Sequence, residues 1–135
     1  MSGPLDGLVV VALEQAVAAP FATRQLADAG ARVIKIERVG EGDFARHYDD
    51  AMGPGYSSWF LWLNRGKESV ELDVKTAEGR VVLADLIARA DVLVQNLVPG
   101  ALDRLGLGTA ELRARHPRLV TCSITGYGPD GPYRD

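Results

Sequence analysis

Three basic residues stand at or near the ends of segments that have the pattern of strands. Arg38 directly follows the apolar segment 32–37, Lys75 follows a short predicted strand at 69–74, and Arg104 lies shortly after the segment 91–96. Guanidinium and ammonium groups bind phosphate oxygens through charge-assisted hydrogen bonds. The three residues therefore favour a phosphate-bearing ligand, although single basic residues at loop starts are as often solvated surface charges.

Other reactive side chains give weaker signals. Cys122 is the only cysteine, so it cannot form an internal disulfide, and its strand-like surroundings predict a buried, inert thiol. His47 lies beside aspartates in a polar loop, which is more typical of a surface than of a metal site. His116 follows a predicted helix and should meet its C-terminal carbonyl groups. We expect no metal site and no catalytic residue among these side chains.

The elements that would position the cations begin with a β-α-β unit. Residues 7–13 form a continuous apolar run typical of a buried parallel strand, and 32–37 form a second one. Between them, Pro20 suits the first turn of a helix that continues over 22–29 and ends at Gly30. Short connections of this kind imply parallel strands and a right-handed crossover.

The remaining chain continues the alternation of strands and helices. A polar loop covers 39–56, an apolar cluster covers 59–62, and a helix with Thr76 as its N-cap precedes the strand at 91–96. Short helices at 101–105 and 109–115 and a strand from Leu119 follow. This order predicts an α/β fold: an open, mainly parallel, Rossmann-like sheet with helices on both faces and ligands beyond the carboxyl ends of its strands.

Known nucleotide motifs and several function classes are disfavoured. The first β–α connection, residues 14–20, contains no glycine, so the G-x-G-x-x-G fingerprint of dinucleotide sites is absent. The net charge of −3 argues against a nucleic-acid partner. No apolar stretch approaches the roughly 20 residues needed to cross a membrane, and no secretory signal is evident. We therefore expect one cytoplasmic domain.

A loop rich in glycine and proline, residues 126–132, follows the last predicted strand. Glycine permits positive φ and proline restricts its neighbours, so such a loop has a defined shape. Shaped loops at strand ends commonly hold a ligand or lead to a catalytic group.

At this point several segments resemble one family. The matching stretches, in order along nearly the whole chain, are 18–23, 26–38, 42–46, 64–69, 71–75, 91–96 with 99–100, 103–107, 123–128 and 131–133. They are similar to the N-terminal portion of the family III CoA-transferases, the group of the formyl-CoA, carnitine and bile-acid CoA-transferases.

The resemblance implies an enzyme that moves CoA from an acyl-CoA to another carboxylic acid. In this family an aspartate attacks the thioester, giving a mixed anhydride and then an aspartyl-CoA thioester. By the match, the CoA contacts fall on Val17, Ala18, Arg38, Leu72, Lys75, Asn96, Leu97 and Arg104. Three of these are the cations already noted, which strengthens the prediction of a polyanionic ligand.

The chain departs from the family at some of these positions. Val17 stands where some members have glutamine, and Ala19 where many have glycine. Leu97 replaces a common phenylalanine, so packing near the cofactor should differ. The family's nucleophilic aspartate is expected beyond residue 135, and Asp135 itself matches a non-catalytic position.

The resemblance also implies a larger protein. Residues 1–135 would form the N-terminal part of the CoA-transferase α/β domain, inactive alone, without the second domain. The full-length form would be a homodimer of interlocked rings. The segments 44–46 and 59–65 look more like transferases that use dicarboxylates such as mesaconate or citramalate. An acyl-CoA racemase of the same superfamily and a non-catalytic CoA-binding module are the alternatives.

Overall fold

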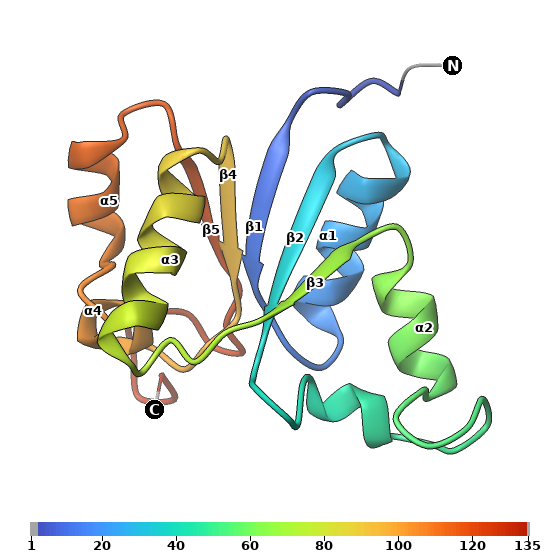
Figure 1. The fold of residues 1–135 in the computed structure, drawn as a ribbon. Coiled ribbons are helices and arrows are strands. Elements are labelled where there is room, and N and C mark those ends of the chain that lie inside the picture. The colour runs from blue at the N-terminus through green and yellow to red at the C-terminus, as the bar shows by residue number, and fades with distance from the viewer. Residues whose placement is uncertain (1–2, 135) are drawn as a thin grey trace.

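The computed structural model describes residues 3–134 as one five-stranded sheet covered by helices on both faces (Figure 1). The strand order is β3-β2-β1-β4-β5, and every neighbouring pair is parallel. The strands are β1 (Val9–Leu13), β2 (Arg32–Glu37), β3 (Glu68–Glu71), β4 (Val92–Gln95) and β5 (Val120–Ser123). The predicted α/β class with a parallel sheet is confirmed.

Most of the helices lie where the sequence predicts a helix, and the apolar cluster at 59–62 is part of a further helix that was not predicted. The helices are α1 (Ala18–Asp28), α2 (Ser58–Asn64), α3 (Ala77–Ala88), α4 (Ala101–Arg104), α5 (Thr109–Arg115) and the short 3-10 helix η1 (Phe44–His47). Helix α3 begins at the predicted cap, where the Thr76 hydroxyl accepts a hydrogen bond from the Gly79 N–H at 3.0 Å. Helix η1 lies within residues 39–56, which were expected to be a loop. It was not predicted because four residues are too few to show a helical period.

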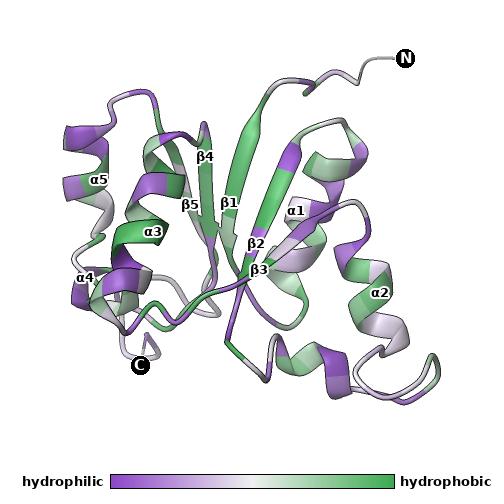
Figure 2. Cartoon of the chain, viewed as in Figure 1, coloured by the Kyte–Doolittle hydropathy of each residue, from purple (hydrophilic) through white to green (hydrophobic). Residues whose placement is uncertain are grey.

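Alternate residues of the strands pack against different helices. Val11 and Leu13 join the larger core with residues of α3, α4 and α5, whereas Val10 and Ala12 join a smaller core with Ala19 of α1. Figure 2 shows hydrophobic residues concentrated on the central strands β1 and β4. Both faces of the sheet are therefore covered, as a parallel sheet requires.

Strand β5 corrects one prediction. It lies at the edge of the described sheet and pairs only with β4, so most of its side chains are exposed. Cys122, expected to be a buried thiol, is exposed here. The apolar sequence around it indicated a strand correctly, but it could not show that the strand has a neighbour on one side only.

The topology also fixes where a ligand can bind. From β1 the chain moves outward through β2 to β3, and then returns to β4 on the other side of β1. The strand order therefore reverses between β1 and β4. In open α/β sheets the crevice beyond the carboxyl ends of strands at such a point is the usual ligand site.

Candidate functional site

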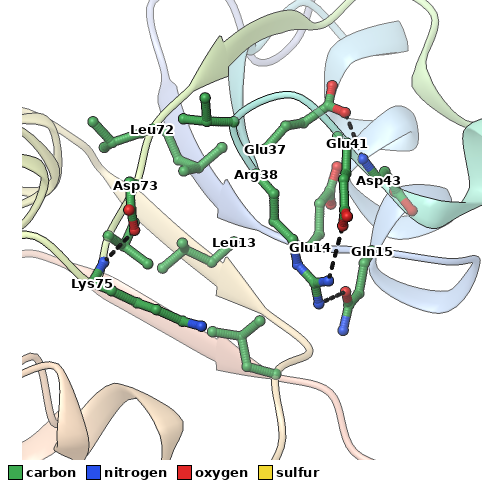
Figure 3. Close-up of a pocket in the computed structure, with 15 residues that line it drawn as sticks. Leu13, Glu14, Gln15, Glu37, Arg38, Glu41, Asp43, Leu72, Asp73 and Lys75 are labelled. Atoms are coloured by element: carbon green, nitrogen blue, oxygen red, sulfur yellow. Dashed lines mark hydrogen bonds and ion pairs between the residues drawn. The ribbon is translucent and has the colours of Figure 1, made fainter.

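A pocket of about 500 Å³ lies at the carboxyl ends of β1 and β2 (Figure 3). The segments that line it follow four different strands. They are residues 13–15 at and after the end of β1, residues 36–39 and 41–43 at and after the end of β2, residues 72–75 after β3, and Leu97 after β4. The pocket thus occupies the edge of the sheet at which the topology predicts a ligand.

Four of the predicted site residues line this pocket: Arg38, Leu72, Lys75 and Leu97. Lys75 extends from one wall toward the opposite wall, which carries Arg38 and Gln15 (Figure 3). The Arg38 guanidinium donates to Gln15 Oε1 at 3.4 Å and lies 4.0 Å from Glu41. Two cations and two leucines around one cavity can hold a ligand that has both anionic and apolar parts.

The other four predicted residues lie outside the lining of the pocket. Val17 and Ala18 are exposed at the start of α1, directly after the loop that follows β1. Arg104 is exposed at the end of α4, with its guanidinium close to the backbone of Gly100 in the loop after β4. The side chain of Asn96 is bonded to the backbone of Gln15 rather than open to the pocket.

Two residues that line the pocket, Glu14 and Asp43, belong to a buried ionic cluster that the sequence did not predict. The Lys35 ammonium is 2.8 Å from Asp43 and 3.5 Å from Glu14, and the Lys67 ammonium is 2.6 Å from Glu14. Thr23 adds a hydrogen bond to Glu14 at 2.6 Å. Two carboxylates and two ammonium groups balance in charge, which is what buried ions need.

A signal for this cluster is present in β2. Lys35 stands between apolar neighbours in a strand buried on both faces, so its ammonium cannot reach water and needs a carboxylate partner. The sequence alone does not say which carboxylate serves, because Glu14 and Asp43 lie on different loops.

Two ionisable groups near the pocket, Glu37 and Lys67, have shifted pKa values. Burial works to raise the pKa of the Glu37 carboxyl, but hydrogen bonds from Arg46, Ser69 and the Asp43 N–H outweigh it and hold that pKa at about 2. Burial lowers the pKa of the Lys67 ammonium to about 8, against the opposing effect of Glu14. Glu37 therefore remains an anion across the physiological range of pH.

The glycine-rich loop, residues 126–132, is mostly exposed to solvent. The Thr125 hydroxyl accepts from the Gly128 N–H at 2.8 Å, and the rings of Tyr127 and Tyr133 lie 5.8 Å apart. Both tyrosines are exposed. Asp135, expected to be non-catalytic, lies outside the described residues.

Within residues 3–134, no group of three or more histidine, cysteine, aspartate or glutamate side chains is arranged to hold a metal ion. In the same part of the chain, no helix has the length and apolar character that crossing a membrane requires.

The structure is an α/β domain of Rossmann-like topology that has a pocket at the carboxyl edge of its sheet and lacks the glycine fingerprint of dinucleotide sites. Comparison with known proteins identifies the protein family to which this domain belongs. The model of CoA-transferase family III matches residues 5–135. The chain belongs to this family, and the predicted membership is confirmed.

Individual relatives agree with this assignment. The chain is 44% identical over 130 residues to an acetyl-CoA:oxalate CoA-transferase from Acetobacter aceti, covering 96% of the chain and 33% of the relative. A succinyl-CoA–D-citramalate CoA-transferase from Chloroflexus aurantiacus is 39% identical over 132 residues, with 98% and 33% covered. The chain thus spans about a third of the length of these relatives.

A solved structure shows the same fold. The crystal structure of a CAIB/BAIF family protein from Brucella suis superimposes with a TM-score of 0.91 at 43% identity. The match covers 99% of this chain and 36% of the other.

Proposed function

We propose that this chain forms the CoA-binding part of an acyl-CoA:carboxylate CoA-transferase. The observation that carries the proposal is the pocket at the carboxyl edge of the sheet, where Arg38 and Lys75 project from opposite walls beside Leu72 and Leu97. The phosphates of CoA suit the cations, and its pantetheine arm suits the leucines.

The remaining predicted contacts extend the same surface. Val17 and Ala18 lie where the loop after β1 enters α1, and Arg104 lies beside the loop after β4. All three are exposed, so a ligand longer than the pocket could reach them. We propose that CoA runs along this edge and that Arg104 contacts one of its phosphates.

The substrates we propose are an acyl-CoA and a carboxylic acid. Relatives named for oxalate and for D-citramalate support a dicarboxylate such as mesaconate or citramalate. The proposed reaction starts when an aspartate oxygen attacks the thioester carbonyl and CoA leaves as thiolate. The thiolate then attacks the aspartyl carbonyl of the mixed anhydride, releasing the donor acid and leaving an aspartyl-CoA thioester.

The same steps in reverse deliver CoA to the acceptor acid. The acceptor carboxylate displaces the thiolate from the aspartyl thioester, and the thiolate then attacks the acyl carbonyl of the new anhydride. This sequence regenerates the aspartate. We assign none of residues 3–134 as the nucleophile and propose that the 135-residue chain alone does not catalyse transfer.

We also propose the wider setting that the resemblance implies. The chain would be the N-terminal part of the large domain of a cytoplasmic enzyme that works as a homodimer. Its coverage of about a third of the relatives supports a longer functional unit.

Calorimetric titration of the 135-residue chain with CoA tests the binding proposal. Arg38→Ala and Lys75→Ala should each weaken binding about tenfold, because each removes a charge-assisted contact to phosphate. Arg32→Ala is the matched control, because Arg32 begins the strand that Arg38 follows and lies at the opposite end from the pocket. Pantetheine, which lacks phosphate, should bind the wild-type chain and Arg38→Ala equally.

Three results would contradict the proposal. They are absence of CoA binding by the wild-type chain, equal affinity of Arg38→Ala and the wild-type chain, and a loss as large in Arg32→Ala. Transfer by the chain alone from an acyl-CoA to oxalate, followed by chromatography, would overturn the statement that it is inactive by itself.

A further inference from the structure

The loop after β1 contains the one non-glycine residue with positive φ among residues 3–134. Ala16 has φ of 65°, in the left-handed region that disfavours a residue with a Cβ atom. Such a conformation persists only where surrounding contacts impose it, and it often marks a functional segment. Ala16 directly precedes Val17 and Ala18, the residues expected to meet CoA.

Three side chains hold the backbone of residues 14, 15 and 16. Lys35 donates to the Glu14 carbonyl at 3.3 Å. Asn96 binds both backbone groups of Gln15, accepting from its N–H at 2.9 Å and donating to its carbonyl at 2.8 Å. Asp43 accepts from the Ala16 N–H at 3.0 Å.

These side chains come from different parts of the fold, so they fix the loop from separate directions. Lys35 lies in β2, Asp43 lies in the segment after β2, and Asn96 directly follows β4 on the other side of β1. Asp43 is itself held, because its second oxygen pairs with the buried ammonium of Lys35 at 2.8 Å. The strained residue is thus anchored to the buried ionic cluster.

The loop also contacts the pocket. Gln15 lines it, and Gln15 Oε1 accepts from the Arg38 guanidinium. The loop is therefore joined to Arg38 through this hydrogen bond and to Val17 through the backbone.

We propose that Asn96 is a positioning residue, which together with Asp43 holds residues 14–16 in the shape that the CoA site needs. This inference rests on the proposed function. It gives Asn96 a role different from direct contact of its side-chain amide with CoA, because one oxygen and one N–H of that amide already bind Gln15. A loop held in its bound shape loses less conformational entropy when a ligand arrives.

A rescue experiment separates positioning from contact. Asn96→Ala removes the two bonds to Gln15 and leaves the bond of Asp43 to Ala16, so Ala16 leaves positive φ part of the time and must return to it for binding; we expect CoA affinity to fall about fivefold. Glycine adopts positive φ without a steric penalty. Ala16→Gly should therefore change the affinity of the wild-type chain little and restore most of the loss in Asn96→Ala.

The outcomes distinguish this inference from the proposed function. If the wild-type chain binds CoA and Ala16→Gly restores nothing in the Asn96→Ala chain, the positioning role of Asn96 is overturned. If the wild-type chain does not bind CoA, the proposed function fails. Hydrogen exchange then still tests whether Asn96 holds the loop. The backbone amides of Gln15 and Ala16 should exchange faster in Asn96→Ala than in the wild-type chain, and unchanged exchange overturns the inference.

A second pair of variants tests the other anchor. Asp43→Ala with and without Ala16→Gly should show the same partial rescue of CoA affinity. If Asp43→Ala does not fold, because it leaves Lys35 unpaired, the Asn96 variants decide the question alone. Thermal unfolding of every variant shows which of them are folded.

Discussion

The two faces of the sheet are stabilised by different chemistry. The face that packs against α3, α4 and α5 has a large core of aliphatic residues, such as Ile34, Ile36 and Leu83. The face that packs against α1 has a small core rich in alanine, and its continuation toward the carboxyl edge is ionic, through Lys35 and Glu37. Alternate residues of one strand, β2, thus belong to an apolar face and to a polar face.

The apolar face mainly stabilises the fold, whereas the polar face fixes the positions of particular atoms. Apolar burial is non-directional, so it stabilises the fold without fixing any one atom. Hydrogen bonds and buried ion pairs require particular distances and angles, and an unpaired member is costly. The polar face lies where the loop after β1 must have one shape, and the apolar face lies where only close packing is needed.

The largest expected effect comes from breaking the ionic cluster. Lys35→Ala removes the partner of Asp43 and should lower the free energy of unfolding by about 4 kcal/mol, because it leaves a buried charge uncompensated. Urea denaturation measures the change. Arg32→Ala is the control, since its pair with Glu68 is exposed and should contribute less than about 1 kcal/mol.

A variant of the same residue sharpens the comparison. Lys35→Met keeps the length of the side chain and removes the charge. If Lys35→Met were as stable as the wild-type chain, the charge of Lys35 would not be what stabilises this face.

On the apolar face, Leu83→Ala should cost about 3 kcal/mol, because Leu83 is fully buried and its truncation leaves a cavity. CoA affinity should stay unchanged, since Leu83 does not line the pocket. Val82→Ala, at a half-exposed neighbour, serves as the control with a small effect. A clear loss of CoA affinity in folded Leu83→Ala would mean that the two faces are not separate in function.

The acid dependence of stability should come from the polar face. The pKa of Glu37 is about 2 in the folded chain and about 4.5 when unfolded, so the unfolded chain takes up the proton first as pH falls. Stability from this group is present above the unfolded value and should decline by about 2 kcal/mol between neutral pH and about pH 3. Urea denaturation at several pH values measures it, and Glu37→Gln should flatten this part of the curve. An unchanged slope in Glu37→Gln would assign the acid sensitivity to other carboxylates.

The sequence predicted the apolar face better than the polar one. Continuous apolar runs and helical periods are local patterns, so β1, β2 and α3 were predicted close to their observed limits. The predicted strand at 69–74 is shorter in the structure, because β3 ends at Glu71 where its partner β2 ends at Glu37. Such an end depends on a partner in space, which a local pattern does not contain.

The candidate site shows the same division. Arg38 and Lys75 could be expected near the ligand edge, because both follow predicted strands, and the structure places both at the pocket. Asn96 lies 81 positions along the chain from Gln15, to which it bonds, and Asp43 lies 27 positions from Ala16. No rule of sequence spacing predicts that these residues meet, so their hydrogen bonds to residues 14–16 could be found only from the folded chain.

The smallest expected effect tests whether single hydrogen bonds matter on the apolar side. Thr76→Ala removes the N-cap of α3 and should lower the free energy of unfolding by about 1 kcal/mol, whereas Thr76→Ser should retain most of it. The loss is smaller than in Lys35→Ala because Thr76→Ala removes one hydrogen bond between neutral groups, whereas Lys35→Ala leaves the nearly fully buried carboxylate of Asp43 without its ammonium partner. Urea denaturation of both variants checks this, and a loss in Thr76→Ala as large as that in Lys35→Ala would contradict the division between the two faces.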